Sequence, residues 1–472
     1  MTTTPYRSRR SAIAVTALTL LLTGCATFSS DGGFDNVSAL TQKRIGQPVS
    51  FTKPTAPTET ISETASQLLA SPLTPDTAVQ IVLLNNKGLQ ASFAQLGIVE
   101  ADLVQAGRLA NPEFSFGRTN LQEGVEIERS IMFDLIGILA MPVRVGIEQQ
   151  RFEQAKLLAA SQAVQLAADT RRAYFNAVAA QETAKYMEQV RSATDVGAEL
   201  AQRLANVGNI SKLDRARQQV LYADATGQLA RARHNAIATR EQLKRLLGLS
   251  DANTSFTLPN RLPDLPKAPE EMPEIEQLTM NQRLDVQMAK RNAEATASAL
   301  GLTKATRFIN VLHAGYTNTS ETGEERVNGY EIELVLPIFD WGSARTAKAE
   351  AIYMQSVHQA ADLAVRARSQ VRESYSAYRT TYDLAKHYRE EVVPLRKLIS
   401  EEMLLRYNGM FSSVFELLAD ARDQINSVNA AIEAQRDFWI AETELQAAIN
   451  GTGGNSLQMR GSAPAATADA GH

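Results

Sequence analysis

An internal repeat constrains the fold of this sequence more than any other feature. Sliding the chain by 201 residues places Tyr174 on Tyr375 and Gly208 on Gly409. Each half then has the same order of expected elements: a helical segment, a pair of strands, a long helix, a glycine-containing turn and a returning helix. We therefore predict one architecture that is built twice.

The repeat and the local composition divide the chain into six segments. The linker between the repeats holds five prolines from Pro259 to Pro273, which forbid helix and favour an extended crossing. The segments are a signal peptide at 1–24, a lipidated extended segment at 25–73, the first repeat at 74–250, the linker at 251–273, the second repeat at 274–450 and a disordered tail at 451–472.

The long helices predict an elongated molecule. Residues 143–206 contain no proline, and a helix of that length spans about 96 Å at ~1.5 Å per residue. A compact globule of this size has a radius of gyration of about 22 Å and cannot hold it. Small and apolar residues recur at alternating spacings of three and four, which predicts left-handed coiled-coil packing. An ordinary coiled coil without a lumen fits the helices equally well.

Each long helix has its own expected packing seam. In the first half, the seam of the long helix contains Phe152, Ala155, Ala159, Ala163, Leu166, Thr170, Ala173, Ala177, Ala180, Ala184 and Met187. The returning helix shows the same rhythm at Leu213, Ala216, Val220, Ala223, Gly227, Ala230, His234 and Ile237. In the second half, the seam contains Met354, Val357, Ala361, Ala364, Arg368, Val371, Tyr375, Tyr378, Tyr382 and Ala385.

Four segments alternate apolar and polar residues as strands do: 113–120, 125–133, 308–319 and 327–339. Strands of about ten residues joined by polar turns are typical of membrane β-barrels, which need at least about eight strands. Four strands cannot close a barrel, so several chains must contribute, and three chains give twelve strands. The alternative is a half-buried sheet in a soluble domain.

The N-terminal leader predicts export. A basic stretch ending at Arg10 precedes an apolar run at 12–22 and then small residues, the order of a secretory signal. The run Leu22-Thr23-Gly24-Cys25 resembles the bacterial lipobox, in which the cysteine becomes the lipidated first residue, and Ala26 points by resemblance to the outer membrane. The alternative is an ordinary cleavage site beside an unmodified Cys25. No later stretch reaches the ~20 apolar residues of a membrane helix, so a bilayer crossing would need strands in a closed barrel.

Composition excludes several classes of function. The formal charge of −4 falls to near −7 once the three arginines of the leader are removed, so the basic footprint of a nucleic-acid-binding protein is absent. One cysteine and five scattered histidines argue against a disulfide scaffold or a thiolate metal site. The sequence shows no phosphate-binding loop, no paired histidines at metal spacing and no nucleophile beside a base. We therefore expect neither an enzyme nor a cofactor.

Three motifs, in order, resemble one family. They are Thr74-Pro75-Asp76-Thr77-Ala78 leading to Asn85-Asn86, residues 101–106 leading to Asn111-Pro112, and Leu336-Pro337-Ile338-Phe339-Asp340-Trp341-Gly342. Over nearly all of the mature chain, the sequence resembles the TolC-type outer-membrane factors of tripartite export systems. The resemblance implies a homotrimer, with a twelve-stranded barrel in the outer membrane that continues into a helical tube. It also implies two protein partners, a periplasmic adaptor and an inner-membrane transporter that supplies the energy, and a passive route for small solutes such as drugs or metal ions.

The two turns between long helices are the expected docking points for the adaptor. The first turn, with Gly208, Ser211 and Asp214, is close to the family's tip pattern. The second, with Gly409 and Ser412, is one residue shorter than the family's Arg-Tyr-x-x-Gly. Capping of the helices alone would also account for these residue types.

The resemblance also places a pore gate. Glu416 occupies the position of the first of two aspartates that ring the closed pore in the family, and Ala419 occupies the second, with Asp420 adjacent. Carboxylates repeated around a narrow opening favour cations. An exposed acid on a helix face is the alternative for Glu416. The rival function for the whole chain is a periplasmic coiled-coil adaptor or tether without a pore, which explains Cys25 but not two matching pairs of strands.

Overall fold

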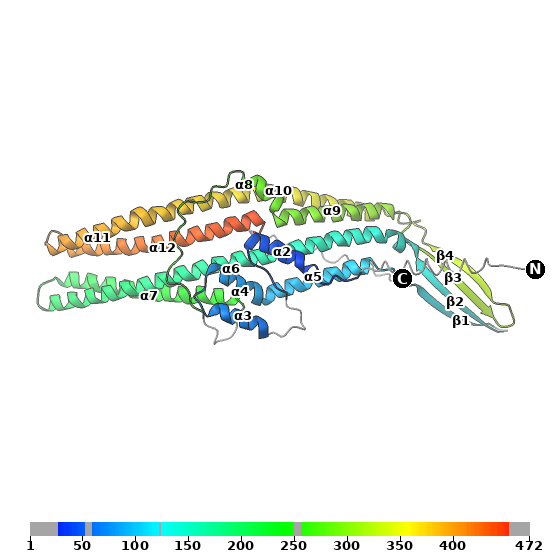
Figure 1. Ribbon diagram of the computed structural model, residues 1–472, viewed down its shortest axis with the longest axis horizontal. Coiled ribbons are helices and arrows are strands. Elements are labelled where there is room, and N and C mark those ends of the chain that lie inside the picture. Colours follow the sequence, from blue (N-terminus) through cyan, green and yellow to red (C-terminus); the bar gives the residue numbers. More distant parts are fainter. Residues whose placement is uncertain (1–26, 52–58, 122–123, 250–255, 453–472) are drawn as a thin grey trace, which may run out of the picture. The chain divides into compact units, whose positions relative to one another are not determined.

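The computed structural model describes residues 27–51, 59–121, 124–249 and 256–452 (Figure 1). The expected signal peptide, Cys25 and nearly all of the expected tail lie outside the described residues.

The described residues form two compact units. The first unit comprises the chain up to Asn36 together with Phe93–Ala159 and Val286–Leu363. The second comprises Val37–Ser92, Ala160–Asp285 and the chain from Ala364 onward.

The chain is mainly helical with one small antiparallel sheet, which confirms the mainly α fold with a small β part that the long helices and four strand segments predict. The elements, in chain order, are α2 (Phe34–Ile45), α3 (Glu59–Leu69), α4 (Pro75–Asn85), α5 (Lys87–Ala106), β1 (Glu113–Leu121), β2 (Gly124–Asp134), α6 (Leu135–Asn206), α7 (Lys212–Leu246), α8 (Ile275–Gln282), α9 (Leu284–Ala305), β3 (Leu312–Glu321), β4 (Val327–Leu334), α10 (Ser343–His387), the π-helical turn η1 (Tyr388–Val392), α11 (Val393–Asn408) and α12 (Val414–Asn450).

The four strands form a single sheet in the first unit, in the order β1-β2-β3-β4, with every neighbouring pair antiparallel. Each repeat supplies one hairpin, so the pairing of β2 with β3 joins the repeats. The predicted strands are confirmed, but β3 starts later than 308 and β4 ends earlier than 339. The β2 ladder stops where Asp134 pairs with His313, because α6 begins at the next residue. Pro337 has no N–H to donate to a strand ladder. After β4, the N–H of Ile338 donates to the carbonyl oxygen of Leu336 at 2.8 Å and closes a tight turn.

α6 confirms the predicted long helix and is 72 residues long. It begins upstream of the proline-free run, and Pro142 lies in its second turn. The Asp134 carboxylate accepts the N–H of Gly137 at 2.8 Å, which satisfies one of the free donors at the helix start. The predicted seam of α6 is buried at most positions, including Ala159, Ala163 and Thr170.

The predicted seams of α7 and α10 are only partly buried within the single chain. α7 carries apolar residues on two faces, and the face that packs within the chain contains Leu221, Ala225 and Leu229. The predicted residues of α7 stay more than half exposed at Leu213, Val220 and Ile237. In α10 the predicted seam is buried at Val371, Tyr378, Tyr382 and Ala385, with Tyr375 partly buried, whereas Met354 is 45% exposed.

The proline-rich segment between the repeats has neither helix nor strand from 256 to 274. Aromatic side chains of the second unit bind its backbone. The Tyr382 hydroxyl donates to the carbonyl oxygen of Lys267 at 2.9 Å, and the Trp439 indole N–H donates to that of Pro263 at 3.0 Å. The segment is therefore bound along α10 and α12.

The η1 turn interrupts the long helix of the second repeat and has no counterpart in α6. Before it, Tyr174 and Tyr375 lie 201 residues apart. After it, Ser211 and Ser413, the caps of α7 and α12, lie 202 residues apart. A π-turn holds an extra residue because its hydrogen bonds run from i to i+5. We infer that η1 absorbs one inserted residue and leaves the helix on either side undisturbed.

Candidate functional site

The first helix tip joins α6 to α7 and brings together the residues predicted there. Gly208 has a left-handed backbone with φ 80°, and the N–H of Asn209 donates to the carbonyl oxygen of Leu204 at 2.9 Å. This pattern ends α6 in a Schellman motif. The Ser211 hydroxyl accepts the N–H of Asp214 at 3.0 Å and donates to the Asp214 carboxylate at 2.7 Å, which caps α7.

The second tip, between α11 and α12, has the same backbone geometry, displaced by one residue from the prediction. Gly409 has φ −79°, and Met410 is the left-handed residue with φ 62°. The N–H of Phe411 donates to the carbonyl oxygen of Arg406 at 2.8 Å, which closes this tip as the first is closed. Met410, rather than Gly409, is therefore the equivalent of Gly208. The motif is not shortened, since methionine occupies its glycine position.

Ser413, rather than Ser412, caps α12. The Ser413 hydroxyl accepts the N–H of Glu416 at 3.2 Å, and the Glu416 carboxylate accepts the N–H of Ser413 at 3.1 Å, a capping box. The Ser412 hydroxyl donates to the same carboxylate at 2.7 Å. This hydroxyl, followed by the Ser413 N–H, lowers the pKa of Glu416 from its usual value. Glu416 is exposed and fixed at the tip.

Asp420, the second predicted gate residue, differs from Glu416 in its surroundings. It lies one turn further along α12 and is only 7% exposed. Its Oδ2 atom has no hydrogen-bond partner among the described residues. Ala419, beside it, is exposed.

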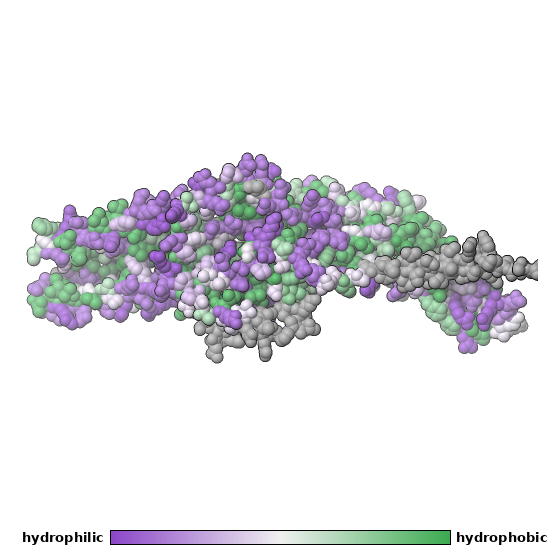
Figure 2. Space-filling view, viewed as in Figure 1, coloured by the Kyte–Doolittle hydropathy of each residue, from purple (hydrophilic) through white to green (hydrophobic). Residues whose placement is uncertain are grey.

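Both tips end in apolar side chains, which Figure 2 shows as hydrophobic surface at the ends of the two hairpins. Val207 is 70% exposed in the first tip, and Met410 and Phe411 are 93% and 86% exposed in the second. Sequence reasoning missed Met410 and Phe411. Two large apolar residues directly after a turn glycine were the available signal.

The two hairpins are packed together within the second unit. The Arg422 guanidinium of α12 lies 3.4 Å from the Asp224 carboxylate of α7. Ile425 of α12 packs against a buried cluster that includes Ala225 and Leu229 of α7. These contacts join the two hairpins along α7 and α12.

The sheet separates charge by face. Side chains of paired residues share a face, and successive side chains alternate between faces. The acidic face contains Glu113, Glu126, Glu128, Asp134, Glu321, Glu331 and Glu333. The apolar face contains Phe114, Phe116, Val125, Ile127, Ile131, Phe133, Leu312, Tyr316, Tyr330, Ile332 and Leu334, with Arg118 and Arg129. In the view of Figure 2, hydrophobic residues gather along one border of the strands. Sequence reasoning found the alternation but not this separation, which depends on the register of all four strands.

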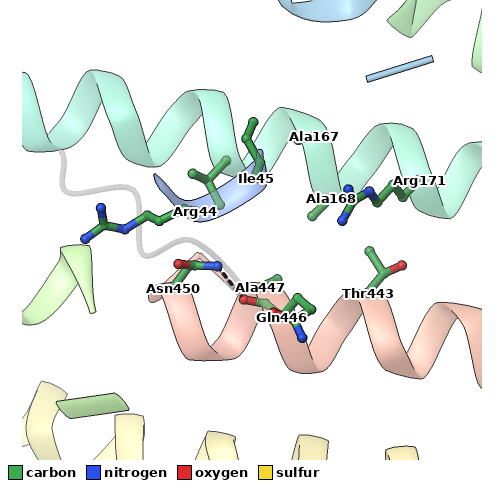
Figure 3. A pocket seen from close by; sticks show the side chains of 10 residues that line it. Arg44, Ile45, Ala167, Ala168, Arg171, Thr443, Gln446, Ala447 and Asn450 are labelled. Atoms are coloured by element: carbon green, nitrogen blue, oxygen red, sulfur yellow. Dashed lines mark hydrogen bonds between the residues drawn. The ribbon is translucent and has the colours of Figure 1, made fainter. Parts of the chain in front are cut away.

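A small cavity in the second unit is a separate polar site (Figure 3). It is partly open and has a volume of about 100 Å³ between the ends of α2 and α12 and the middle of α6. The Nε atom of Arg44 is buried without a partner among the described residues, and burial lowers the pKa of this guanidinium. The last carbonyls of α2 and α12 carry partial negative charge, which disfavours an anion. The cavity suits ordered water.

Within the described ranges, no group of three His, Cys, Asp or Glu side chains is placed to hold a metal ion. No helix of the described chain has the length and apolar character needed to cross a bilayer.

Comparison with known proteins was made at the level of families, curated sequences and solved structures. No protein-family model matches the chain. The chain is 24% identical over 277 residues to the cobalt-zinc-cadmium resistance protein CzcC of Cupriavidus metallidurans. The match covers 57% of this chain and 64% of the length of that protein.

Solved structures resemble the chain over most of its length. The outer-membrane channel OprN matches with a TM-score of 0.70 and 18% identity, covering 82% of this chain and 91% of OprN. CusC, whose structures describe transmembrane channel formation, matches with a TM-score of 0.68 and 15% identity, covering 80% and 92%. The open state of the Neisseria gonorrhoeae MtrE outer-membrane channel matches with a TM-score of 0.66 and 17% identity, covering 80% and 89%. These likenesses show that the chain has the fold of the TolC-type outer-membrane efflux channels, the family that its motifs resemble.

Proposed function

We propose that three copies of this chain form a passive channel through the outer membrane, as the outer component of a tripartite efflux system. The sheet is the observation that carries this proposal. In the described chain, β1 and β4 are its edges, each paired on one side only. An open edge leaves backbone donors and acceptors unpaired, which a bilayer does not tolerate. If β1 of one copy pairs with β4 of the next, the sheet closes into a barrel without free edges, and three copies give twelve strands.

The charge separation across the sheet supports the same assembly. In a closed barrel, the apolar face meets lipid and the acidic face lines the lumen. The α7 face with Leu213, Val220 and Ile237 is also exposed in the single chain. We assign a second copy of the chain as its partner, because burying this stripe between copies removes apolar surface from water.

Small solutes, either drugs or metal ions, are the proposed cargo. The carboxylates of the acidic face favour cations by their summed field. A relative named for cobalt, zinc and cadmium resistance agrees with cation passage. An inner-membrane transporter would supply the energy, since the channel is passive.

The two tips are the proposed docking surface for a periplasmic adaptor. The first tip offers Gly208, Ser211 and Asp214, and the second offers Gly409, Ser412, Met410 and Phe411. Photo-crosslinkers at Asn209 and Phe411 leave both serine caps intact. Adaptor crosslinks at these positions support the docking role, and crosslinks confined to other surfaces contradict it.

Glu416 is the proposed gate residue, with Asp420 behind it on α12. Glu416→Gln removes the charge but keeps the capping box, because glutamine also forms this motif. We expect weaker block of the reconstituted channel by multivalent cations. Unchanged block would exclude Glu416 as the gate.

Cys25 is the proposed lipidation site, which would add an anchor in the outer membrane. Several acyl chains at ~0.8 kcal/mol per buried methylene give a stable anchor. Mass spectrometry of the N-terminal peptide tests this, and an unmodified cysteine would reject it.

The channel itself is tested by reconstitution. Heat-resistant trimers that conduct ions in planar bilayers are expected. A monomer that binds membranes without conductance would instead support the tether without a pore.

A further inference from the structure

The two arginines of the strands lie on the face of the sheet that carries the apolar residues. Arg118 of β1 pairs with Ile127, and Arg129 of β2 pairs with Phe116, so the arginines are diagonal neighbours. None of the acidic residues of the strands lies on this face. Arg118 is exposed and makes no hydrogen bond or ion pair with the described residues. Two like charges therefore share a surface on which the described strands provide no counter-charge.

A row of polar side chains extends from Arg129 across three strands. The Arg129 guanidinium donates to the Asn318 amide oxygen at 3.0 Å. The Asn318 amide nitrogen in turn donates to the Asn328 amide oxygen at 2.8 Å. The Tyr316 hydroxyl donates to the same Asn328 oxygen at 2.6 Å. Between this row and the helices the face is apolar, as at Ile131, Phe133, Ile332 and Leu334. The row therefore marks where an apolar band gives way to polar groups.

We propose that Arg118 and Arg129 bind the phosphate groups of anionic lipids at the headgroup level of the bilayer. This inference rests on the proposed barrel, in which the apolar face meets lipid. An arginine on a barrel's lipid face is destabilising by roughly 2–4 kcal/mol at the bilayer midplane and by about 0–1 near the interface. The position of both arginines beside the polar row fits the interface. A guanidinium also matches phosphate oxygens in a two-bond geometry that other cations lack.

Native mass spectrometry of the full-length trimer tests the proposal. The trimer is extracted from vesicles of phosphatidylcholine mixed with phosphatidylglycerol, and the retained lipids are counted. We expect selective retention of phosphatidylglycerol by the unmodified protein. Arg118→Gln combined with Arg129→Gln should lower retention by about five-fold for each arginine removed, since a basic residue at a membrane surface contributes about 1 kcal/mol. Equal retention by this variant and the unmodified protein would overturn the proposal.

Matched variants separate a lipid site from simple charge effects. Arg326→Gln removes a positive charge from the turn before β4 and should leave lipid retention unchanged. Replacing both arginines by lysine keeps the charge but loses the planar fork, so partial retention is expected. An equal loss in Arg326→Gln would contradict the assignment to Arg118 and Arg129. Displacement of the lipid by millimolar inorganic phosphate would also contradict it, because it would indicate a site for the free anion.

Conductance distinguishes failure of this inference from failure of the proposed channel. A double variant that conducts normally but retains no phosphatidylglycerol supports the lipid site. An unmodified trimer that conducts but shows no preference between the two lipids overturns only the lipid site. If the double variant does not fold, Arg118→Gln alone is measured, because Arg118 has no bond within the described chain to lose. Absence of conductance in the unmodified protein would refute both proposals together.

Discussion

Met410 holds in the second helix tip the left-handed backbone conformation that Gly208 holds in the first. A side chain in this conformation is strained by roughly 1–2 kcal/mol, whereas glycine adopts it freely. Met410→Gly should therefore raise the free energy of unfolding by about 1 kcal/mol, after allowance for the greater freedom of glycine in the unfolded chain. Chemical denaturation monitored by circular dichroism measures the change.

The reciprocal variant is the matched control for this prediction. No atom lies within 4 Å of a Cβ built at Gly208, so Gly208→Met tests backbone strain without a clash. It should destabilise by about 1 kcal/mol after the same allowance for the unfolded chain. A Met410→Gly variant less stable than the unmodified protein would show that contacts of the methionine side chain outweigh the strain.

The η1 turn predicts that the protein tolerates deletion of one residue from this turn. Removal of Glu390 should convert the π-turn into regular α-helix and leave the second tip in register. The melting temperature should change by only a few degrees, because the ion pairs of Glu390 are exposed and weak.

Removal of Lys397 from the regular part of α11 is the control. This deletion turns the following residues by about 100° around the helix axis and separates the pair formed by Ser400 and Gln424. We expect strong destabilisation. Equal tolerance of both deletions would contradict the inserted-residue account.

Arg283 lies at the centre of a buried polar cluster, and we expect loss of its charge to destabilise the fold. Its side chain is 2% exposed and bonds both oxygens of Asp285, the Gln370 amide oxygen and the carbonyl oxygen of Ala448. Arg283→Met leaves these acceptors without the guanidinium and should destabilise by about 3–5 kcal/mol. Arg261→Met, at an exposed pair with Asp264, should change stability by less than about 1 kcal/mol in the same denaturation assay. Similar effects of the two variants would contradict the burial argument.

The long helices and the strands could be predicted because their signals are periodic and local. The sequence alone did not predict which residues of the two tips are structurally equivalent. One extra residue in a helix leaves propensity and composition unchanged, so the shift of 201 that relates Tyr174 to Tyr375 predicts Gly409 as the turn residue. The structure places the left-handed turn at Met410 instead.

The packing face of α7 shows a second limit of the sequence. Val220 and Leu221 are adjacent, and both lie in apolar patterns of helical spacing. Only tertiary contact decides that Leu221 is buried in the chain and Val220 is not. The separation of charge in the sheet was similarly hidden, because it requires the register of β2 against β3.

The acidic face predicts the ion selectivity of the proposed channel. Glu331 and Glu333 of β4 lie on it, and Glu333 pairs with His313 at 3.1 Å. Changing both glutamates to glutamine should lower the ratio of potassium to chloride permeability, measured from reversal potentials in a salt gradient. Glu271→Gln, in the linker, is the control and should have no effect. An unaltered ratio in the β4 variant would place these residues outside the lumen.

Closure of the sheet between copies is the central claim, and disulfide crosslinking of its two edges tests it most directly. Within one chain, β2 and β3 separate β1 from β4, so a cysteine in each edge strand can bridge only between copies. Pairs that combine Ser115→Cys or Gly117→Cys with Gly329→Cys or Glu331→Cys sample neighbouring registers, in a chain with Cys25 kept as the native residue. Oxidation of at least one pair should give covalent dimers and trimers, and controls that carry only one of the two introduced cysteines beside Cys25 should give none. Only monomers across every pair, from protein that is membrane-bound and folded, would contradict it.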